Sequence, residues 1–426
     1  MFQERSEPYI IFDEPILSPF TLLPALPTQN PSDIFLRLRV DDEFLLNRII
    51  IPRNDSRRFK LVSIIQNNGL CLVCVAIEFQ FIGLQKDPIA CFERAEIESL
   101  KQQRMFREIS GVDVEKIMAA QIEASELVFQ KRVNGGEYVL LPNYVAVKMS
   151  LNHTTLHSGE IQFQENSNFN VRGVLPYNRR MLREISAMQH INSIPPNPRI
   201  NHSNVFLQNS FCVMMISPYF QYSLEDYFQI NRMENDEHLQ RIVFKILEGL
   251  HHIHSTLKMS HRDISPDNIL INPIWNEENA IVDFDVKLID FEHSIIVPDI
   301  DTIINSETVP IGKNHYRCPE FDSLSNYLGY SADIWSLAEV LYYALTGQNL
   351  FDFGYSQTTH IRDVTVFGEL GDVFEEGSHS EEVKLFLLRC YRLSKLERPK
   401  AEELMDDDWF GFINRLLIQA LNHTDR

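Results

Sequence analysis

The sequence has little cysteine and no long apolar run, and both absences exclude classes of protein. Its six cysteines are scattered over 426 residues. Cys71 and Cys74 form a C-x-x-C, but no second pair follows at zinc-site spacing. We therefore expect buried cysteines in a strand and a reducing, intracellular compartment. The longest apolar run, residues 70–77, is far too short to cross a bilayer, so no membrane span is expected.

Positive charge is also scarce. Lysine and arginine number 39 against 59 aspartates and glutamates, which gives a formal net charge of −20. This balance argues against a nucleic-acid backbone as a partner. An anionic ligand would need its own local cations. Acids and prolines near the start of the sequence are not typical of a signal peptide. We expect a cytoplasmic protein, with a nuclear location not excluded.

Residues 1–120 contain no catalytic constellation. Many prolines precede residue 30 and indicate an extended arm. The predicted elements that follow are strands over residues 34–40, 46–51 and 70–81 and a helix over residues 57–66. They favour a small N-terminal α+β module, for which a ubiquitin-like sheet is one arrangement. A helical pattern over residues 91–126 would link this module to the rest of the chain.

The pattern changes after residue 126. Residues 127–149 read as a dense set of short strands, and residues 179–190 as a helix. Residues 206–216 give two more strands. Beyond residue 224 the chain is mostly helical. The sequence therefore predicts a small sheet with one helix, followed by a larger helical region.

Three ordered motifs stand in this second part of the chain. Residues 261–268 read HRDISPDN, residues 290–292 read DFE, and residues 145–148 read VAVK. In this order and spacing they resemble the motifs of the protein-kinase family, over about residues 124–420. The resemblance implies a bilobed α+β fold with a small antiparallel β-sheet lobe plus one helix, and a larger, mainly α-helical lobe. The accessory region 1–120 would precede it.

The resemblance also implies a site for ATP and Mg²⁺. Phosphoryl transfer depends on positioning and charge stabilisation, so the site needs cations, metal ligands and a proton acceptor. Lys148 would hold phosphates and pair with Glu184, which could otherwise be an exposed helix carboxylate. Asp263 would orient or accept the proton of the substrate hydroxyl. Asn268 and Asp290 would bind Mg²⁺, although both residue types also favour turns.

The nucleotide-binding region departs from the family pattern. The chain has no complete G-x-G-x-x-G, and the best candidate loop carries Gly135 and Gly136, which could equally be a hairpin turn. Val139 and Ala146 resemble the apolar positions on either side of adenine. Glu292 stands where the family usually has glycine, and it places a second acid beside the predicted metal site.

A further departure has the form of an exchange. Most Ser/Thr kinases have a lysine two residues after the catalytic aspartate and a threonine after the glycine that precedes Pro-Glu. Here the first position is Ser265 and the second is Lys313. In the family both side chains lie beside the aspartate that matches Asp263. We hypothesise that Lys313 supplies the ammonium near the γ-phosphate and Ser265 the hydroxyl.

Other matches predict structural or regulatory roles. Arg398 would form a buried ion pair with Glu320 of a Cys-Pro-Glu segment. His254 is expected in the core rather than at a metal. A phosphate on Thr308 could pair with Arg262.

These features favour a Ser/Thr protein kinase that uses ATP and Mg²⁺ on protein substrates. The segment 265–267, Ser-Pro-Asp, does not match the loop type of tyrosine kinases. The alternative is a pseudokinase, a scaffold or allosteric binding module with little turnover, which the thin glycine loop and Glu292 would fit. Under both hypotheses, region 1–120 is a candidate binding site for a protein partner.

Overall fold

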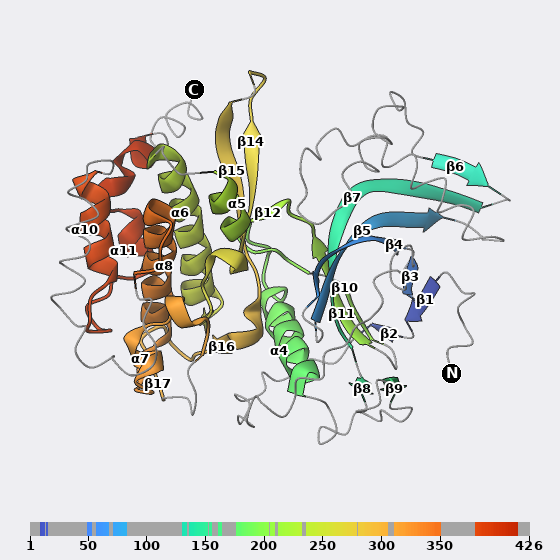
Figure 1. The fold of residues 1–426 in the computed structure, drawn as a ribbon, viewed down its shortest axis with the longest axis horizontal. Helices are drawn as coiled ribbons and strands as arrows, with labels where there is room; N and C mark the ends of the chain where they lie inside the picture. The colour runs from blue at the N-terminus through green and yellow to red at the C-terminus, as the bar shows by residue number, and fades with distance from the viewer. Residues whose placement is uncertain are drawn as a thin grey trace. The chain divides into compact units, whose positions relative to one another are not determined.

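Two compact units make up the chain (Figure 1). The first unit takes in residues 1–20, 29–185 and 202–219, and the second takes in residues 21–28, 186–201 and 220–426. The computed structural model describes residues 9–12, 14–15, 49–52, 57–67, 71–82, 130–133, 136–151, 153–155, 161–163, 176–203, 205–208, 212–231, 236–278, 280–305, 311–350 and 380–415.

The first unit is built on a nine-stranded sheet. Along the sheet the strand order is β1-β3-β4-β5-β7-β11-β10-β2, and β6 pairs with β7. All neighbours are antiparallel except β1 and β3. Its elements are β1 (Tyr9–Phe12), β2 (Glu14–Pro15), β3 (Ile49–Pro52), β4 (Arg57–Asn67), β5 (Cys71–Ile82), β6 (Gln130–Val133), β7 (Gly136–Leu151), β10 (Val205–Gln208) and β11 (Cys212–Pro218), with a separate pair β8 (His153–Thr155) and β9 (Ile161–Phe163) and the start of helix α4 (Pro176–Ile191).

Strand β4 shows that the predicted helix over residues 57–66 is wrong. Phe59, Leu61 and Ser63 are buried at alternate positions, as one face of a sheet requires. The register against β5 shifts between Leu61 and Ser63 and again between Ile64 and Gln66. Two such irregularities break the strict alternation of apolar residues, and the resulting spacing resembles that of a helix.

The sheet takes its strands from both of the predicted regions, 1–120 and 124–420. The predicted strand over residues 70–81 is confirmed as β5, and its two cysteines are buried. β5 pairs with β7 over most of its length, with Val73 opposite Lys148. The two strands share one hydrophobic core. A functional division near residue 120 stays a prediction, but strands on both sides of it complete a single sheet.

The second unit is mainly helical, as predicted. Its centre is α8, whose side chains are buried from Gly329 to Tyr342. The elements are β12 (Tyr222–Ser223), α5 (Leu224–Ile230), α6 (Asp236–His251), a π-helical turn (His252–Thr256), β13 (Met259–Ser260), β14 (Ile269–Trp275), β15 (Ile281–Leu288), β16 (Ile295–Ile296), β17 (Ile303–Ile304), α7 (Pro319–Asp322), β18 (Tyr327–Leu328), α8 (Gly329–Thr346), α10 (Glu381–Cys390) and α11 (Ala401–Met405).

The predicted fold class is confirmed by these two units. An antiparallel sheet with one helix precedes a mainly helical unit, which is the α+β arrangement that the resemblance implies. In the part of the chain that the structure describes, no helix is both long and apolar enough to span a membrane.

Candidate active site

Two segments hold the Asp263 carboxylate, the loop between β13 and β14 at one oxygen and Lys313 at the other. Asn268 Nδ2 donates to Asp263 Oδ2 over 2.9 Å and to the Asp263 carbonyl over 2.8 Å. The Lys313 backbone amide donates to Asp263 Oδ1 over 3.1 Å. The aspartate is buried but for a small exposed fraction. Its side chain therefore has a fixed direction before any ligand binds.

Asp333, near the start of α8, anchors this loop. It accepts from the amides of His261, over 2.8 Å, and Arg262, over 2.7 Å, and His254 Nε2 lies 2.8 Å from its Oδ2. Burial alone would raise the pKa of Asp333, but the contact with His254, the charges of the imidazoles and the Arg262 amide outweigh burial, and the pKa lies below its ordinary value. His254 is in the core, as predicted.

Asn268 and Asp290 fit the requirements of a magnesium site. The amide nitrogen of Asn268 is directed to Asp263, which leaves its carbonyl oxygen for another ligand. The main-chain amide of Ile289, the neighbour of Asp290, donates to the main-chain carbonyl of Asn268 over 3.1 Å. Asp290 has a left-handed backbone, with φ of 63°, which is uncommon outside glycine and is often found at functional sites. Hard oxygen ligands of this kind suit Mg²⁺.

Lys148 and Glu184 form an ion pair within the first unit. Lys148 Nζ, on β7, lies 2.7 Å from Glu184 Oε2, on α4. Glu184 is almost fully buried, and Lys148 is partly exposed. The predicted pairing is therefore present, and the exposed-carboxylate alternative for Glu184 does not hold. Ala146 lies two residues before Lys148 on the same strand, opposite Ser217 of β11.

The predicted glycine loop lies at the far end of the strand that carries Lys148. Gly136 opens β7 and pairs with Val133 of β6, while Gly135 lies outside the described residues. Lys148 lies twelve positions after Gly136 along one strand, a path of about 40 Å. Val139 is on the same distant stretch, opposite Gln130. This separation disfavours the predicted phosphate contact of these glycines and supports the hairpin-turn alternative.

Lys313 and Ser265 both meet Asp267. The Lys313 ammonium forms an ion pair with Asp267 Oδ2, and Ser265 Oγ donates to Asp267 Oδ1 over 2.8 Å. The amide of Lys313 also reaches Asp263. The two exchanged residues thus lie within one group beside Asp263.

The extra acid, Glu292, contacts the imidazole of the next residue, His293. His293 Nε2 lies 3.2 Å from Glu292 Oε1. The carboxylate therefore has a partner other than a metal ion. This contact could not be predicted, because the direction of the Glu292 side chain does not follow from the order of residues.

Arg262 already has protein partners. Its Nε donates to the His293 carbonyl over 2.6 Å, and its Nη1 donates to the Tyr327 hydroxyl over 2.8 Å. The guanidinium is buried. Thr308, the predicted phosphate carrier, lies outside the described residues, so its pairing with Arg262 stays a prediction.

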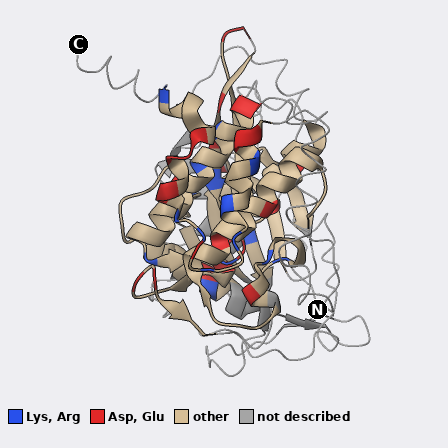
Figure 2. Ribbon diagram, turned by 90° about the vertical axis from the view of Figure 1, so that its left-hand side faces the viewer, with Lys and Arg blue, Asp and Glu red and all other residues tan. Residues whose placement is uncertain are grey.

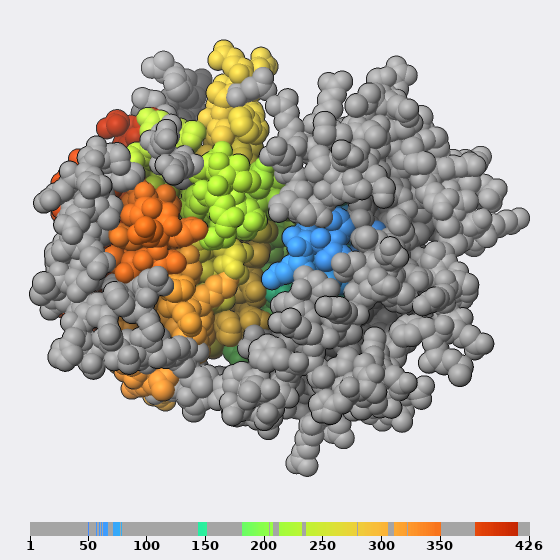
Figure 3. Space-filling view, in the orientation of Figure 1, coloured from blue at the N-terminus to red at the C-terminus, as the bar shows by residue number. Residues whose placement is uncertain are grey.

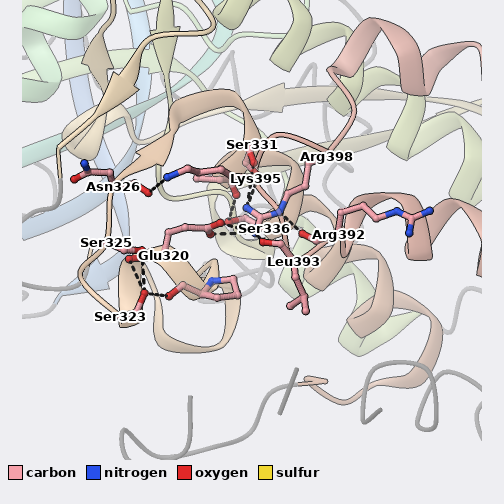
Figure 4. Close-up of polar contacts among 12 residues, drawn as sticks. Glu320, Ser323, Ser325, Asn326, Ser331, Ser336, Arg392, Leu393, Lys395 and Arg398 are labelled. Atoms are coloured by element: carbon pink, nitrogen blue, oxygen red, sulfur yellow. Dashed lines mark hydrogen bonds and ion pairs between the residues drawn. The ribbon is translucent and has the colours of Figure 1, made fainter. Parts of the chain in front are cut away.

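Glu320 and Arg398 form the predicted buried ion pair (Figure 4). Arg398 Nη2 donates to both Glu320 oxygens, over 2.8 and 3.1 Å, and Arg398 Nη1 reaches Ser331 Oγ. The guanidinium also lies over the Trp335 ring, 4.8 Å from its centroid. Removing either charged partner would leave a buried charge uncompensated, which costs about 3–5 kcal/mol. The pair joins α7 to the loop before α11.

Comparison with known proteins places these residues in a family. The model of the protein kinase domain matches residues 164–410. That span includes Glu184, Asp263, Asn268, Asp290 and Lys313, and begins after Lys148.

Curated relatives are distant. A mitogen-activated protein kinase, pmk-1, of Caenorhabditis elegans is 28% identical over 51% of this chain and 52% of its own length. Mitogen-activated protein kinase kinase 2 of Arabidopsis thaliana is 27% identical over 47% of this chain and 52% of its own. A carbon catabolite-derepressing protein kinase of Candida tropicalis is 27% identical over 54% and 34%. The chain spans about half the length of the first two. Since the family model covers more than half of the sequence, the chain belongs to the protein kinase family.

Proposed function

We propose that this chain is a protein kinase that transfers the γ-phosphoryl group of ATP to Ser or Thr hydroxyls of protein substrates. The observation that carries the proposal is the fixed Asp263 carboxylate, held by Asn268 and by the Lys313 amide. An aspartate held in this way suits the task of orienting a hydroxyl and accepting its proton. The Ser/Thr preference rests on two distant relatives named as probable serine/threonine-protein kinases and on the residues that follow Asp263.

The proposed reaction gives each residue a separate task. The substrate oxygen forms a bond to the γ-phosphorus, the bond from that phosphorus to the β–γ bridging oxygen breaks, and ADP leaves. The hydroxyl proton goes to Asp263. Lys148, oriented by Glu184, would hold phosphate oxygens. Asn268 and Asp290 would hold Mg²⁺, which neutralises developing charge on the phosphates.

We further propose that Lys313 contributes a positive charge beside the transferred group. Its ammonium contacts Asp267 only two positions from Ser265, in the same loop as Asp263. A phosphate oxygen would compete with Asp267 for this ammonium. The pairing keeps Lys313 in place in the absence of the nucleotide, which lowers the cost of ordering the side chain on binding.

The test is ATP–Mg²⁺-dependent incorporation of phosphate into the protein itself and into a mixed Ser, Thr and Tyr peptide library. Transfer should fall at least about 100-fold in Asp263→Asn, because general-base catalysis and positioning are lost together. The labelled residues should be Ser and Thr. Absence of transfer by the unaltered chain, together with no thermal stabilisation by ATP–Mg²⁺, would favour the pseudokinase alternative.

A second pair of variants tests Lys313. Lys313→Ala should lower kcat about tenfold or more, since one cation beside the phosphoryl group is worth a few kcal/mol. The double variant Ser265→Lys/Lys313→Thr restores the usual family arrangement and should recover most of the activity. Full turnover in Lys313→Ala would show that the exchange does not supply a needed charge.

A further inference from the structure

The hairpin of β14 and β15 continues an apolar face beyond the core of the second unit. At its base Ile271 and Val286 face each other and are fully buried, and Phe284 is buried opposite Pro273. Side chains alternate along a strand, so Trp275 follows Ile271 and Pro273 on the same face of β14. The register against β15 shifts between Ile274 and Trp275, which leaves Val282 as an extra residue opposite them. That face is therefore apolar both inside the core and past its edge.

Past the edge, large apolar side chains are open to solvent. The exposed fractions are 55% for Trp275 and 42% for Val282, while Ile274, on the opposite face of β14, is 43% exposed. We call residues 274–278 and 280–282 the hairpin tip. Figure 3 shows this hairpin (yellow) standing out at the top of the second unit. Exposed apolar clusters that contain tryptophan are typical of protein-binding surfaces.

The turn of the hairpin tip is ordered by its own contacts. Asn276 Oδ1 accepts from the amides of Glu278, over 3.0 Å, and Ala280, over 2.9 Å. The Asn276 amide donates to the Ala280 carbonyl over 2.9 Å. Three bonds to one residue fix the conformation of the turn. A partner would therefore meet a preorganised surface and would not have to order it.

The charge at the hairpin tip is negative and locally uncompensated. Glu277 and Glu278 are exposed in the turn, which is red in Figure 2. Further down the hairpin, Asp283 pairs with Lys245 over 2.6 Å and Asp285 lies 3.4 Å from Lys287 Nζ. Among the described residues no lysine or arginine is paired with the two glutamates. The tip thus combines an apolar surface with two free negative charges.

We propose that the hairpin tip binds a segment of a partner protein in which apolar side chains alternate with lysine or arginine. Apolar side chains of that segment would cover Trp275 and Val282, and its cations would face Glu277 and Glu278. Charge complementarity of this kind selects partners and speeds encounter. The interaction does not require phosphoryl transfer, so its test is independent of the proposed kinase activity.

Tryptophan fluorescence gives a direct assay. The chain has three tryptophans, and the other two, Trp335 and Trp409, are each 2% exposed. Acrylamide should therefore quench mainly Trp275. The full chain is titrated with a short peptide of alternating leucine and lysine, and with its counterpart of leucine and glutamate. The leucine–lysine peptide should protect Trp275 from acrylamide in a saturable manner, and the leucine–glutamate peptide should not.

Charge-reversal variants locate the interaction. Glu277→Lys/Glu278→Lys should weaken binding of the leucine–lysine peptide about tenfold, as expected when two rim charges become repulsive. The control Glu381→Lys/Glu382→Lys changes the net charge by the same amount, at the exposed start of α10. Equal weakening by both variants, or no saturable protection, would overturn the proposal. Protection without peptide that rises with protein concentration, together with a dimer mass, would show instead that a second copy covers the tip.

Discussion

Gly312 fits its place because a side chain there would meet the loop that carries Asp263. Its φ is +76°, a left-handed conformation that favours glycine. An added Cβ would lie 2.8 Å from the Arg262 carbonyl and 3.2 Å from Asp263 Oδ1. The first distance is below any tolerated contact with a backbone atom. Glycine therefore allows the amide of the next residue, Lys313, to approach the Asp263 carboxylate.

We predict that Gly312→Ala lowers the kcat of phosphoryl transfer in addition to the free energy of unfolding. The control is Gly347→Ala at the end of α8, where φ is +71° but nothing lies within 4 Å of an added Cβ. Gly347→Ala should lose about 1–2 kcal/mol of unfolding free energy, which urea unfolding measures, because it forces a left-handed alanine. Gly312→Ala should lose more, because its Cβ would also lie 2.8 Å from the Arg262 carbonyl oxygen. Only Gly312→Ala should displace Asp263 and lose at least about tenfold in kcat. Equal kcat values would contradict this account.

Spacing along the chain could predict which polar side chains meet, but not what fixes them. Asp263 and Asn268 are five residues apart, and their contact follows from one short loop. Asp333 lies about seventy residues further on and reaches the same loop through its backbone amides. Backbone donors are common to every residue, so the sequence carries no signal for that contact. The resemblance did predict the distant pair of Glu320 and Arg398, because it fixes both positions.

At the scale of elements, Arg262 joins three segments of the second unit. It belongs to the loop that carries Asp263, donates to the His293 carbonyl after β15, and donates to the Tyr327 hydroxyl on β18. β18 in turn pairs with β17, where Ile304 lies opposite Tyr327. One guanidinium thus connects the loop that carries Asp263 with the segment between Asp290 and Glu320.

We predict that Tyr327→Phe loosens these segments together. The change removes one acceptor from a buried guanidinium and should cost about 1–3 kcal/mol. Hydrogen exchange, followed by mass spectrometry, should speed up in residues 261–268 and 303–304. The control Tyr330→Phe keeps the ring contacts of a nearby buried tyrosine with His254 and Lys400 and should leave both segments unchanged. Faster exchange in only one segment would show that Arg262 does not connect them.

Strands and helices were predicted correctly where the spacing of apolar residues was regular. The prediction was wrong where that spacing was interrupted. β5 begins with an apolar run over residues 71–77 and was predicted as a strand. β4 carries two register shifts and was predicted as a helix. Pairing of β5 with β7 could not be predicted, because a long stretch of chain separates the two strands. Consequently the sequence did not indicate that residues 71–82 extend the sheet of Lys148.

At the scale of the whole molecule, one buried acid links stability to pH. Glu339 lies on α8 with no exposed surface. Burial raises its pKa well above the ordinary value of 4.5, although the Tyr391 hydroxyl and the Leu350 amide favour the charged form. Glu339 is therefore protonated in the folded protein at a pH where the unfolded chain has ionised it. Unfolding then releases a proton, and the free energy of unfolding falls as pH rises.

We predict that Glu339→Gln stabilises the protein increasingly as pH rises above 4.5. Glutamine keeps a neutral side chain of the same shape and has no proton to release. The gain in unfolding free energy should grow by about 1 kcal/mol per pH unit until the raised pKa is reached. Urea unfolding at a series of pH values measures it. A gain that is the same at every pH would show that Glu339 ionises alike in both states.

The strand order of the first unit has a consequence for how the protein is made. β11 covers the edge of β7 along residues 145–151, yet it is synthesised some sixty residues later, after α4. Until residue 218 has left the ribosome, the strand of Lys148 has an unpaired edge. Such edges invite pairing with other chains, and late long-range closure is slow. Nascent chains that pause between α4 and β11 should therefore be the ones that most need a chaperone.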